Sequence, residues 1–123
     1  MYQSRVDQSA NLLQVSFSGR VDAQEMERCA KECEVAVRQV RPGFRLLTDI
    51  TDLEQMDLAC EPHLQRMMDL SNEAGVALVV RVIPRPHRDI GFNIMSLFHY
   101  RKNVRIVTCR TLKQAEEILA SEV

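Results

Sequence analysis

Four carboxylates lie in or directly after a short apolar segment near the middle of the chain. The segment Leu46-Leu47-Thr48-Asp49-Ile50 is typical of a strand, and Asp52, Glu54 and Asp57 follow it. Binding sites in open α/β sheets lie beyond the carboxyl ends of the strands. Clustered carboxylates at such a place hold Mg²⁺ or accept a phosphoryl group, and they also form solvated surfaces that face a partner. We expect the partner-facing surface here.

Four cysteines, Cys29, Cys33, Cys60 and Cys109, offer thiol chemistry. Cys29 and Cys33 are four residues apart on one predicted helix, but two thiols are only half of a zinc site. Because they lie among apolar side chains, we expect both to pack as small apolar groups and to bind no metal. Cys60 precedes a predicted helix, whose dipole favours a thiolate. No catalytic partner for Cys60 is evident in the sequence.

The segment Pro84-Arg85-Pro86-His87-Arg88 is a second candidate for ligand chemistry. Its prolines make it rigid, and Arg85, His87 and Arg88 present groups that bind anions. Asp89 begins the next predicted helix, whose backbone N–H groups would strengthen an anion site. A solvated basic turn explains the same residues, and both interpretations stay open.

The charges of the chain are divided between two halves. Residues 46–75 hold seven acidic side chains and one basic, a net charge of −6, whereas residues 76–110 hold seven basic and one acidic, a net charge of +6. These charges either interleave as solvated faces or form two docking surfaces that steer partners.

Composition excludes several classes of protein. The chain has 123 residues, 46% of them apolar, and a formal net charge of −1. Such a chain is long enough for one packed core and too apolar for disorder. It has no apolar run of membrane-spanning length and no leader-like start, and its charge is too balanced for a general nucleic-acid coat. We expect a cytoplasmic protein.

Alternating apolar patterns predict an α/β fold that positions these groups. Strand patterns cover residues 2–6, 13–17, 46–50, 76–83 and 104–108, and helix patterns cover residues 22–40, 62–74, 89–98 and 112–119. The resulting order is β-β-α-β-α-β-α-β-α. It predicts a single domain over residues 1–123, with a mainly parallel sheet of four or five strands, an antiparallel N-terminal hairpin strand and four helices.

Capping signals mark where the predicted helices begin and end. Asp22 is a plausible N-cap of the first helix, which Arg41-Pro42-Gly43 ends. Pro62 suits the first turn of the second helix, and Gly75 suits its end. Thr111-Leu112-Lys113-Gln114 is a capping box for the closing helix.

This order of elements resembles the STAS family of bacterial anti-sigma factor antagonists and sulfate-transporter domains, over most of the chain. The turn from Gly19 to Asp22 is similar to the family turn after the second strand. Asp49-Ile50-Thr51-Asp52-Leu53 and Met56-Asp57-Leu58-Ala59-Cys60 are similar to the two parts of the family's functional loop. The resemblance implies a SpoIIAA-like fold and a protein partner. The strand at Asp49 also resembles that of response-regulator receivers, but the acidic pair and the lysine that receivers need are absent.

The sequence departs from the STAS pattern at the phosphorylated hydroxyl. The family's two hydroxyl positions hold Leu58 and Ala59, and its glycine position holds Cys60. We therefore expect a non-enzymatic regulatory module without a cofactor, which binds a protein partner independently of serine phosphorylation in this loop, although Thr48 or Thr51 could substitute. The partner would be anti-sigma or kinase-like with a basic contact patch. The predicted contact residues are Thr51, Asp52, Glu54, Asp57, Leu58, Cys60, Glu61 and His63.

A carrier of a small apolar ligand or lipid is the alternative function that the resemblance leaves open. Its pocket would lie between the second and third predicted helices. The side chains expected to line it are Met67, Met68, Phe92, Met95 and Phe98.

Overall fold

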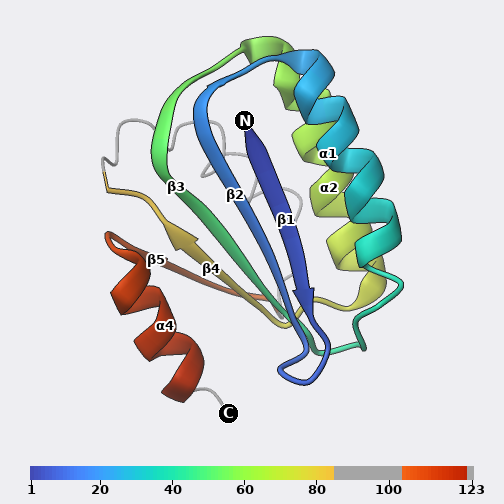
Figure 1. The fold of residues 1–123 in the computed structure, drawn as a ribbon. Coiled ribbons are helices and arrows are strands. Elements are labelled where there is room, and N and C mark those ends of the chain that lie inside the picture. Colours follow the sequence, from blue (N-terminus) through green and yellow to red (C-terminus); the bar gives the residue numbers. More distant parts are fainter. Residues whose placement is uncertain (85–103, 122–123) are drawn as a thin grey trace.

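The structure, a computed structural model, describes residues 1–84 and 104–121. Its elements, in chain order, are β1 (Tyr2–Asp7), β2 (Leu12–Val21), α1 (Ala23–Ala36), β3 (Arg45–Met56), the 3₁₀ helix η1 (Leu58–Cys60), α2 (Glu61–Ala74), β4 (Leu78–Val82), β5 (Arg105–Cys109) and α4 (Leu112–Ser121) (Figure 1). Three of the four predicted α-helices are therefore among the described residues. The helix predicted for residues 89–98 lies outside them.

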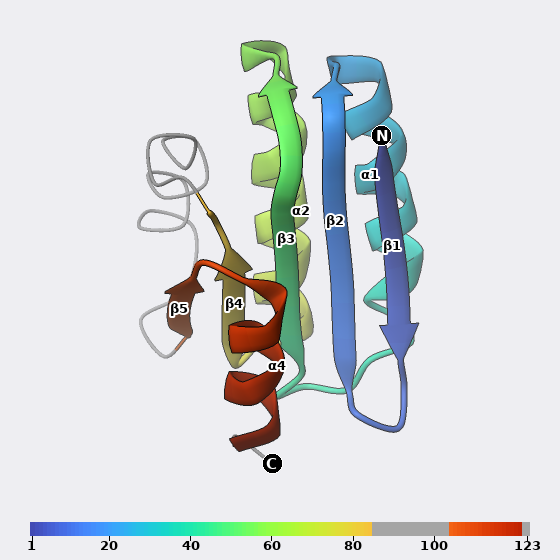
Figure 2. The same cartoon turned by 60° about the vertical axis from the view of Figure 1, so that its left-hand side comes forward.

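The five strands form one sheet in the order β1-β2-β3-β4-β5. β1 pairs with β2 in the antiparallel sense, and every other neighbouring pair is parallel. α1 and α2 lie together on one face, whereas α4 lies on the opposite face against β3, β4 and β5 (Figures 1 and 2). The predicted mixed sheet with an antiparallel N-terminal strand is confirmed.

Alternating side chains make β2 the centre of the core. Leu13, Val15 and Phe17 are buried toward α1 and α2, while the polar residues between them lie on the other face. β4 is buried along its whole length, as its continuous apolar pattern predicts for a strand covered on both faces. Leu47, Val80 and Val82 form a second apolar cluster with the inner face of α4.

The caps confirm the predicted starts of two helices and the end of another. The side chain of Asp22 accepts a hydrogen bond from the Glu25 N–H at 2.8 Å, and the Thr111 hydroxyl accepts one from the Gln114 N–H at 3.1 Å. Gly75 ends α2 in the left-handed conformation, with φ of 89°. These local signals work because each satisfies backbone groups that a helix end leaves unpaired.

β3 continues six residues beyond the predicted strand end at Ile50, so the segment from Thr51 is not a loop as expected. It pairs with β2 as far as Val21 and Met56, and buried Leu53 holds the extension against the core. Two register shifts interrupt this pairing, and Gly19 lies beside one of them with φ of 63°. A register shift breaks the period of two, so the alternation in the sequence does not reveal the extension.

α1 ends at Ala36, earlier than the predicted stop at Arg41-Pro42-Gly43. The following residues form tighter turns, in which the Arg38 N–H donates to the Val35 oxygen and the Gln39 N–H to the Ala36 oxygen. Asn11 then holds the connection, because its side chain accepts from the Arg41 N–H at 2.8 Å and donates to the Arg41 oxygen at 3.2 Å. A tertiary contact thus holds the connection that follows α1.

Within residues 1–84 and 104–121, the helices are too short or too polar to cross a lipid bilayer.

Candidate functional site

The carboxyl ends of β2 and β3 meet at one edge of the sheet and position the candidate site. Val21 and Met56 are partners in the parallel register, and the Asp57 N–H donates to the Val21 oxygen at 3.1 Å. Asp22 then begins α1, while Asp57 leads into η1. The chain therefore enters α1 and η1 from adjacent strand ends.

All the predicted partner-contact residues belong to one continuous stretch at this edge, but they come from three kinds of structure. Thr51, Asp52 and Glu54 are exposed residues of the last part of β3. Asp57, Leu58 and Cys60 belong to the η1 turn, and Glu61 and His63 to the first turn of α2. Their role as a contact surface stays a prediction.

Leu58 is the most exposed large apolar side chain of the described residues, with 89% of its surface accessible. Asp57 beside it and Glu61 at the start of α2 are also exposed. Leu58 is thus an exposed apolar side chain with exposed carboxylates near it in the sequence. The sequence gives little indication that Leu58 is exposed, because this residue is not part of a helical or strand pattern of apolar positions.

Cys60 is buried, in contrast to the exposed Leu58 two residues earlier. Its accessible fraction is 1%, and its thiol donates to the Val21 oxygen at 3.5 Å. Burial and the nearby Asp57 carboxylate raise the pKa of the Cys60 thiol. Desolvation therefore opposes the favourable effect of the helix dipole on a thiolate at this position. Cys60 is therefore a buried support for η1, and unlike the other predicted contact residues of this turn it is not exposed.

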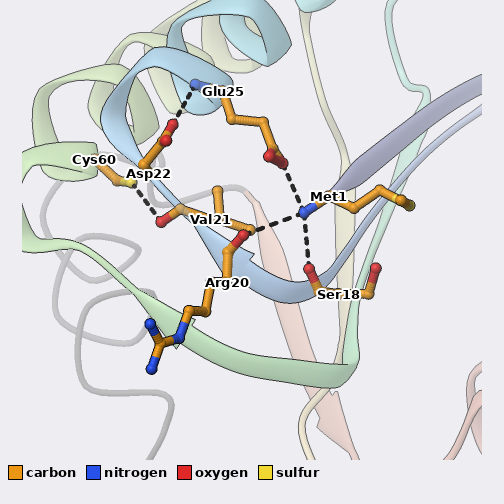
Figure 3. A network of polar contacts seen from close by, with 7 residues as sticks. All are labelled: Met1, Ser18, Arg20, Val21, Asp22, Glu25 and Cys60. Atoms are coloured by element: carbon orange, nitrogen blue, oxygen red, sulfur yellow. Dashed lines mark hydrogen bonds and ion pairs between the residues drawn. The ribbon is translucent and has the colours of Figure 1, made fainter.

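A network of polar contacts fixes the start of β1 beside this edge (Figure 3). The Met1 ammonium donates to the backbone oxygens of Ser18 at 2.8 Å and Arg20 at 3.3 Å, and it lies 2.6 Å from the Glu25 Oε2. Apart from this ion pair, no hydrogen bond reaches that oxygen among the described residues. The three contacts match the three N–H donors of an ammonium group. They connect β1 and β2 to the first turn of α1.

Asp49 and Thr51 lie on the sheet face opposite α1 and α2. The Asp49 Oδ1 accepts from the Thr51 N–H at 2.9 Å and also from the Thr51 hydroxyl. Asp49, Thr51 and Asp52 line a hollow of about 180 Å³ with Ser16 and Ser18 of β2, among others. In residues 1–84 and 104–121, no three acidic, histidine or cysteine side chains are arranged to hold a metal ion.

The part of the predicted apolar pocket that the structure describes is small. Met67 and Met68 line a cavity of about 30 Å³ between α2 and the sheet, together with side chains such as Phe17 and Leu64. This space is about the size of one or two water molecules and is too small for a lipid chain. The remaining predicted pocket residues Phe92, Met95 and Phe98, and the predicted anion-binding residues Arg85, His87 and Arg88, lie outside the described residues.

Cys29 and Cys33 are both buried in the core face of α1, as their apolar surroundings predict. A hydrogen bond with Cys33 and burial raise the pKa of Cys29. Arg81 of the basic half is also buried, with 6% accessible, and donates to the Thr108 hydroxyl at 2.7 Å. Arg81 therefore belongs to the interior and contributes to neither a solvated face nor a docking surface.

Comparisons of the sequence show no match to a protein-family model and none to a curated protein. Solved structures do match. An uncharacterized protein of the DUF3478 family from Shewanella loihica, described as having a SpoIIAA-like fold, has a TM-score of 0.73 and 14% identity, with 96% of this chain and 93% of that chain covered. The Bacillus cell fate determinant SpoIIAA in its phosphorylated form has a TM-score of 0.65 and 18% identity, with 97% and 99% covered.

An anti-sigma factor antagonist from Mycobacterium paratuberculosis has a TM-score of 0.58 and 19% identity, with 98% of this chain and 95% of that chain covered. These similarities extend over nearly the whole of each chain. Together with the observed order and direction of the strands, they show that this chain has the SpoIIAA-like fold.

Proposed function

We propose that this chain is a non-enzymatic regulatory module that binds a protein partner through the exposed surface around η1. The observation that carries the proposal is Leu58, an apolar side chain with 89% of its surface accessible between exposed carboxylates. Buried apolar anchors surrounded by polar contacts supply most of the energy of protein interfaces. Support also comes from the fold, which the chain shares with anti-sigma factor antagonists.

Binding in this proposal does not depend on phosphorylation of the η1 segment. Residues 52–70 contain no serine, threonine or tyrosine, so no hydroxyl is present from the end of β3 to the last part of α2. Thr51 is exposed, but its hydroxyl donates to Asp49 on the open sheet face. The surface is therefore able to bind its partner without prior modification. Binding is controlled by the partner or by another part of the chain.

The chemistry of the surface defines the partner that fits it. Asp57 and Glu61 border Leu58, and Asp52 and Glu54 extend the negative charge along β3. A complementary partner has an apolar pocket for Leu58 with lysine or arginine side chains at its rim. Such rim charges act mainly on the association rate, which falls as salt screens them. We expect this partner to be a cytoplasmic signalling protein of the anti-sigma or kinase-like class.

A pull-down from the source cells in mild salt, read by native mass spectrometry, tests the proposal. The wild-type chain is expected to retain a protein at stoichiometric amount, and Leu58→Asp is expected to lose it. Val35→Asp is the matched control, because Val35 is an apolar residue with 54% of its surface accessible, near the opposite end of α1. The proposal fails if no stoichiometric protein is retained, or if Leu58→Asp retains it as well as Val35→Asp does.

A further inference from the structure

A trough lined by both polar and apolar residues lies on the sheet face that α1 and α2 do not cover. Its volume is about 350 Å³, and its walls come from β1 on one side and α4 on the other. Figure 2 shows that α4 lies over one half of this face and leaves β1 and β2 without a helix in front of them. Its lining includes Gln3, Arg5, Gln14, Ser16, Asp49, Leu112 and Glu116.

The strand register places the polar groups of the trough in two rows. Gln3, Ser16 and Asp49 are neighbours across β1, β2 and β3, so Gln3 and Asp49 lie about 10 Å apart on the spacing of adjacent strands. In the next row, Arg5 is opposite Gln14, and its Nη2 donates to the Gln14 Oε1 at 2.8 Å. This contact holds the guanidinium over the sheet, and it uses one of five N–H donors.

Two carboxylates, those of Asp49 and Glu116, line the trough together with the Arg5 guanidinium. The Asp49 Oδ1 is oriented by the N–H and the hydroxyl of Thr51, and Glu116 projects from α4. In the part of the chain that the structure describes, none of Arg5, Asp49 and Glu116 forms an ion pair. The trough therefore presents one positive and two negative groups to whatever enters it.

We propose that this trough binds a basic α-amino acid such as lysine or arginine. These ligands carry one carboxylate and two cationic groups, which complement the charges of Arg5, Asp49 and Glu116. Leu112, with 39% of its surface accessible, adds an apolar wall for the aliphatic part of the ligand. The volume lies at the lower end of the range for small-molecule sites, which favours an amino acid over a folded partner.

Guanidinium and carboxylate have separate roles in this site. Arg5 binds the ligand carboxylate in the two-pronged geometry that arginine offers, while Asp49 and Glu116 bind the two cationic ends. A diamine without a carboxylate leaves Arg5 without its anion, and an acidic amino acid places negative charge against Asp49 and Glu116. The site is therefore expected to discriminate by charge pattern as well as by size.

Two-dimensional NMR of the whole chain, titrated with L-lysine and L-arginine, tests the assignment. We expect saturable shifts of the Gln3, Ser16 and Asp49 amides, with at least tenfold weaker binding of cadaverine and no binding of L-glutamate. Asp49→Asn keeps an oxygen for Thr51 and removes the charge, so it is expected to weaken lysine binding about tenfold, or 1.4 kcal/mol. Arg5→Gln is expected to abolish the preference for lysine over cadaverine.

Arg28→Gln is the matched control, because Arg28 is an exposed arginine of α1 and lies away from the trough. It is expected to bind lysine as the wild type does. The proposal is overturned if neither basic amino acid gives saturable shifts up to about 10 mM, a range that covers weak millimolar binding. It is also overturned if cadaverine or L-glutamate binds as tightly as lysine, or if Asp49→Asn has no more effect than Arg28→Gln.

Discussion

The thiol of Cys60 donates to the backbone oxygen of Val21, with 3.5 Å between sulfur and oxygen. The contact connects the end of β2 to the η1 turn that follows β3. Leu58 lies two residues earlier on a turn with about three residues per revolution, so its side chain leaves the turn in a different direction. Burial of Cys60 and exposure of Leu58 are therefore two consequences of one short 3₁₀ turn.

The first prediction concerns thiol reactivity. All four cysteines are buried, and burial raises the pKa of Cys60 and of Cys109, so the native thiols hold little of the reactive thiolate. In Ellman's assay at mildly alkaline pH, we expect slow reaction of the native chain and four fast thiols after denaturation. The prediction is contradicted if one thiol of the native chain reacts fast and this fast reaction is absent from Cys60→Ser. That result would show that η1 opens and exposes Cys60.

The second prediction concerns Arg45, whose guanidinium joins two distant segments. Nη1 donates to the Leu119 oxygen in α4 at 2.7 Å, and Nη2 donates to the Ala10 oxygen in the β1–β2 turn at 2.9 Å. Charge-assisted hydrogen bonds to a helix C-terminus are stabilising, so Arg45→Ala is expected to lower the free energy of unfolding by about 2 kcal/mol. Urea denaturation followed by circular dichroism measures this change.

Arg45→Lys provides the control for charge alone. A guanidinium reaches the Leu119 and Ala10 oxygens from two separate nitrogens, whereas an ammonium has a single nitrogen, so lysine is expected to recover only part of the lost stability. Arg28→Ala, at an exposed position of α1, is expected to change the free energy of unfolding by less than about 0.5 kcal/mol. Equal urea midpoints for Arg45→Ala and Arg28→Ala would contradict the role assigned to Arg45.

Arg45 also illustrates which contacts the sequence could predict. Asp22, Gly75 and the pair Thr111 and Gln114 act on backbone groups only a few residues away, so their roles follow from local spacing. The guanidinium of Arg45 instead reaches α4, whose last turn is 74 residues away in the chain. No spacing pattern around an arginine at the start of a strand predicts a hydrogen-bond acceptor so far away in the sequence.

The candidate site was predictable in position but not in form. The resemblance of residues 49–60 to a family loop placed the acidic stretch at the edge of the sheet, where the structure also has it. The extension of β3 depends on register shifts against β2, and the opposite environments of Leu58 and Cys60 depend on a three-residue turn. The first feature arises from pairing between two strands and the second from a turn too short to have a period, so hydrophobic periodicity records neither.

The third prediction concerns alkaline pH and the contact between Tyr2 and Glu32. The Tyr2 hydroxyl donates to the Glu32 Oε1 at 2.9 Å. Desolvation and this hydrogen bond to a carboxylate raise the pKa of Tyr2 from 10.0 to about 12. Because the folded-state pKa is the higher one, the associated stability is fully present below pH 10 and is lost as the pH rises toward 12.

Comparison of wild type with Tyr2→Phe isolates the contribution of Tyr2 to the pH dependence of stability. Cys29, Cys60 and Cys109 also have raised pKa values, but they contribute equally in both proteins. We expect the difference between the two unfolding free energies to be constant below pH 10 and to shrink above it. Tyrosinate absorbance of the folded wild type should show one late titration that is missing in Tyr2→Phe. A pH-independent difference between the two proteins would refute the assignment.

The fourth prediction concerns Gly75, which closes α2 in a conformation that other residues adopt at a cost. Its φ is 89°, and a Cβ at this position would lie 3.2 Å from the Cα of Pro42. We expect Gly75→Ala to lower the free energy of unfolding by about 1 to 2 kcal/mol from backbone strain, with a further loss from the contact. Gly19→Ala is the matched control, because Gly19 also has a positive φ, 63°, but a Cβ there would meet no atom within 4 Å. If urea denaturation shows the same loss of unfolding free energy for both variants, the contact with Pro42 costs nothing. The loss at Gly75 then comes from backbone strain alone.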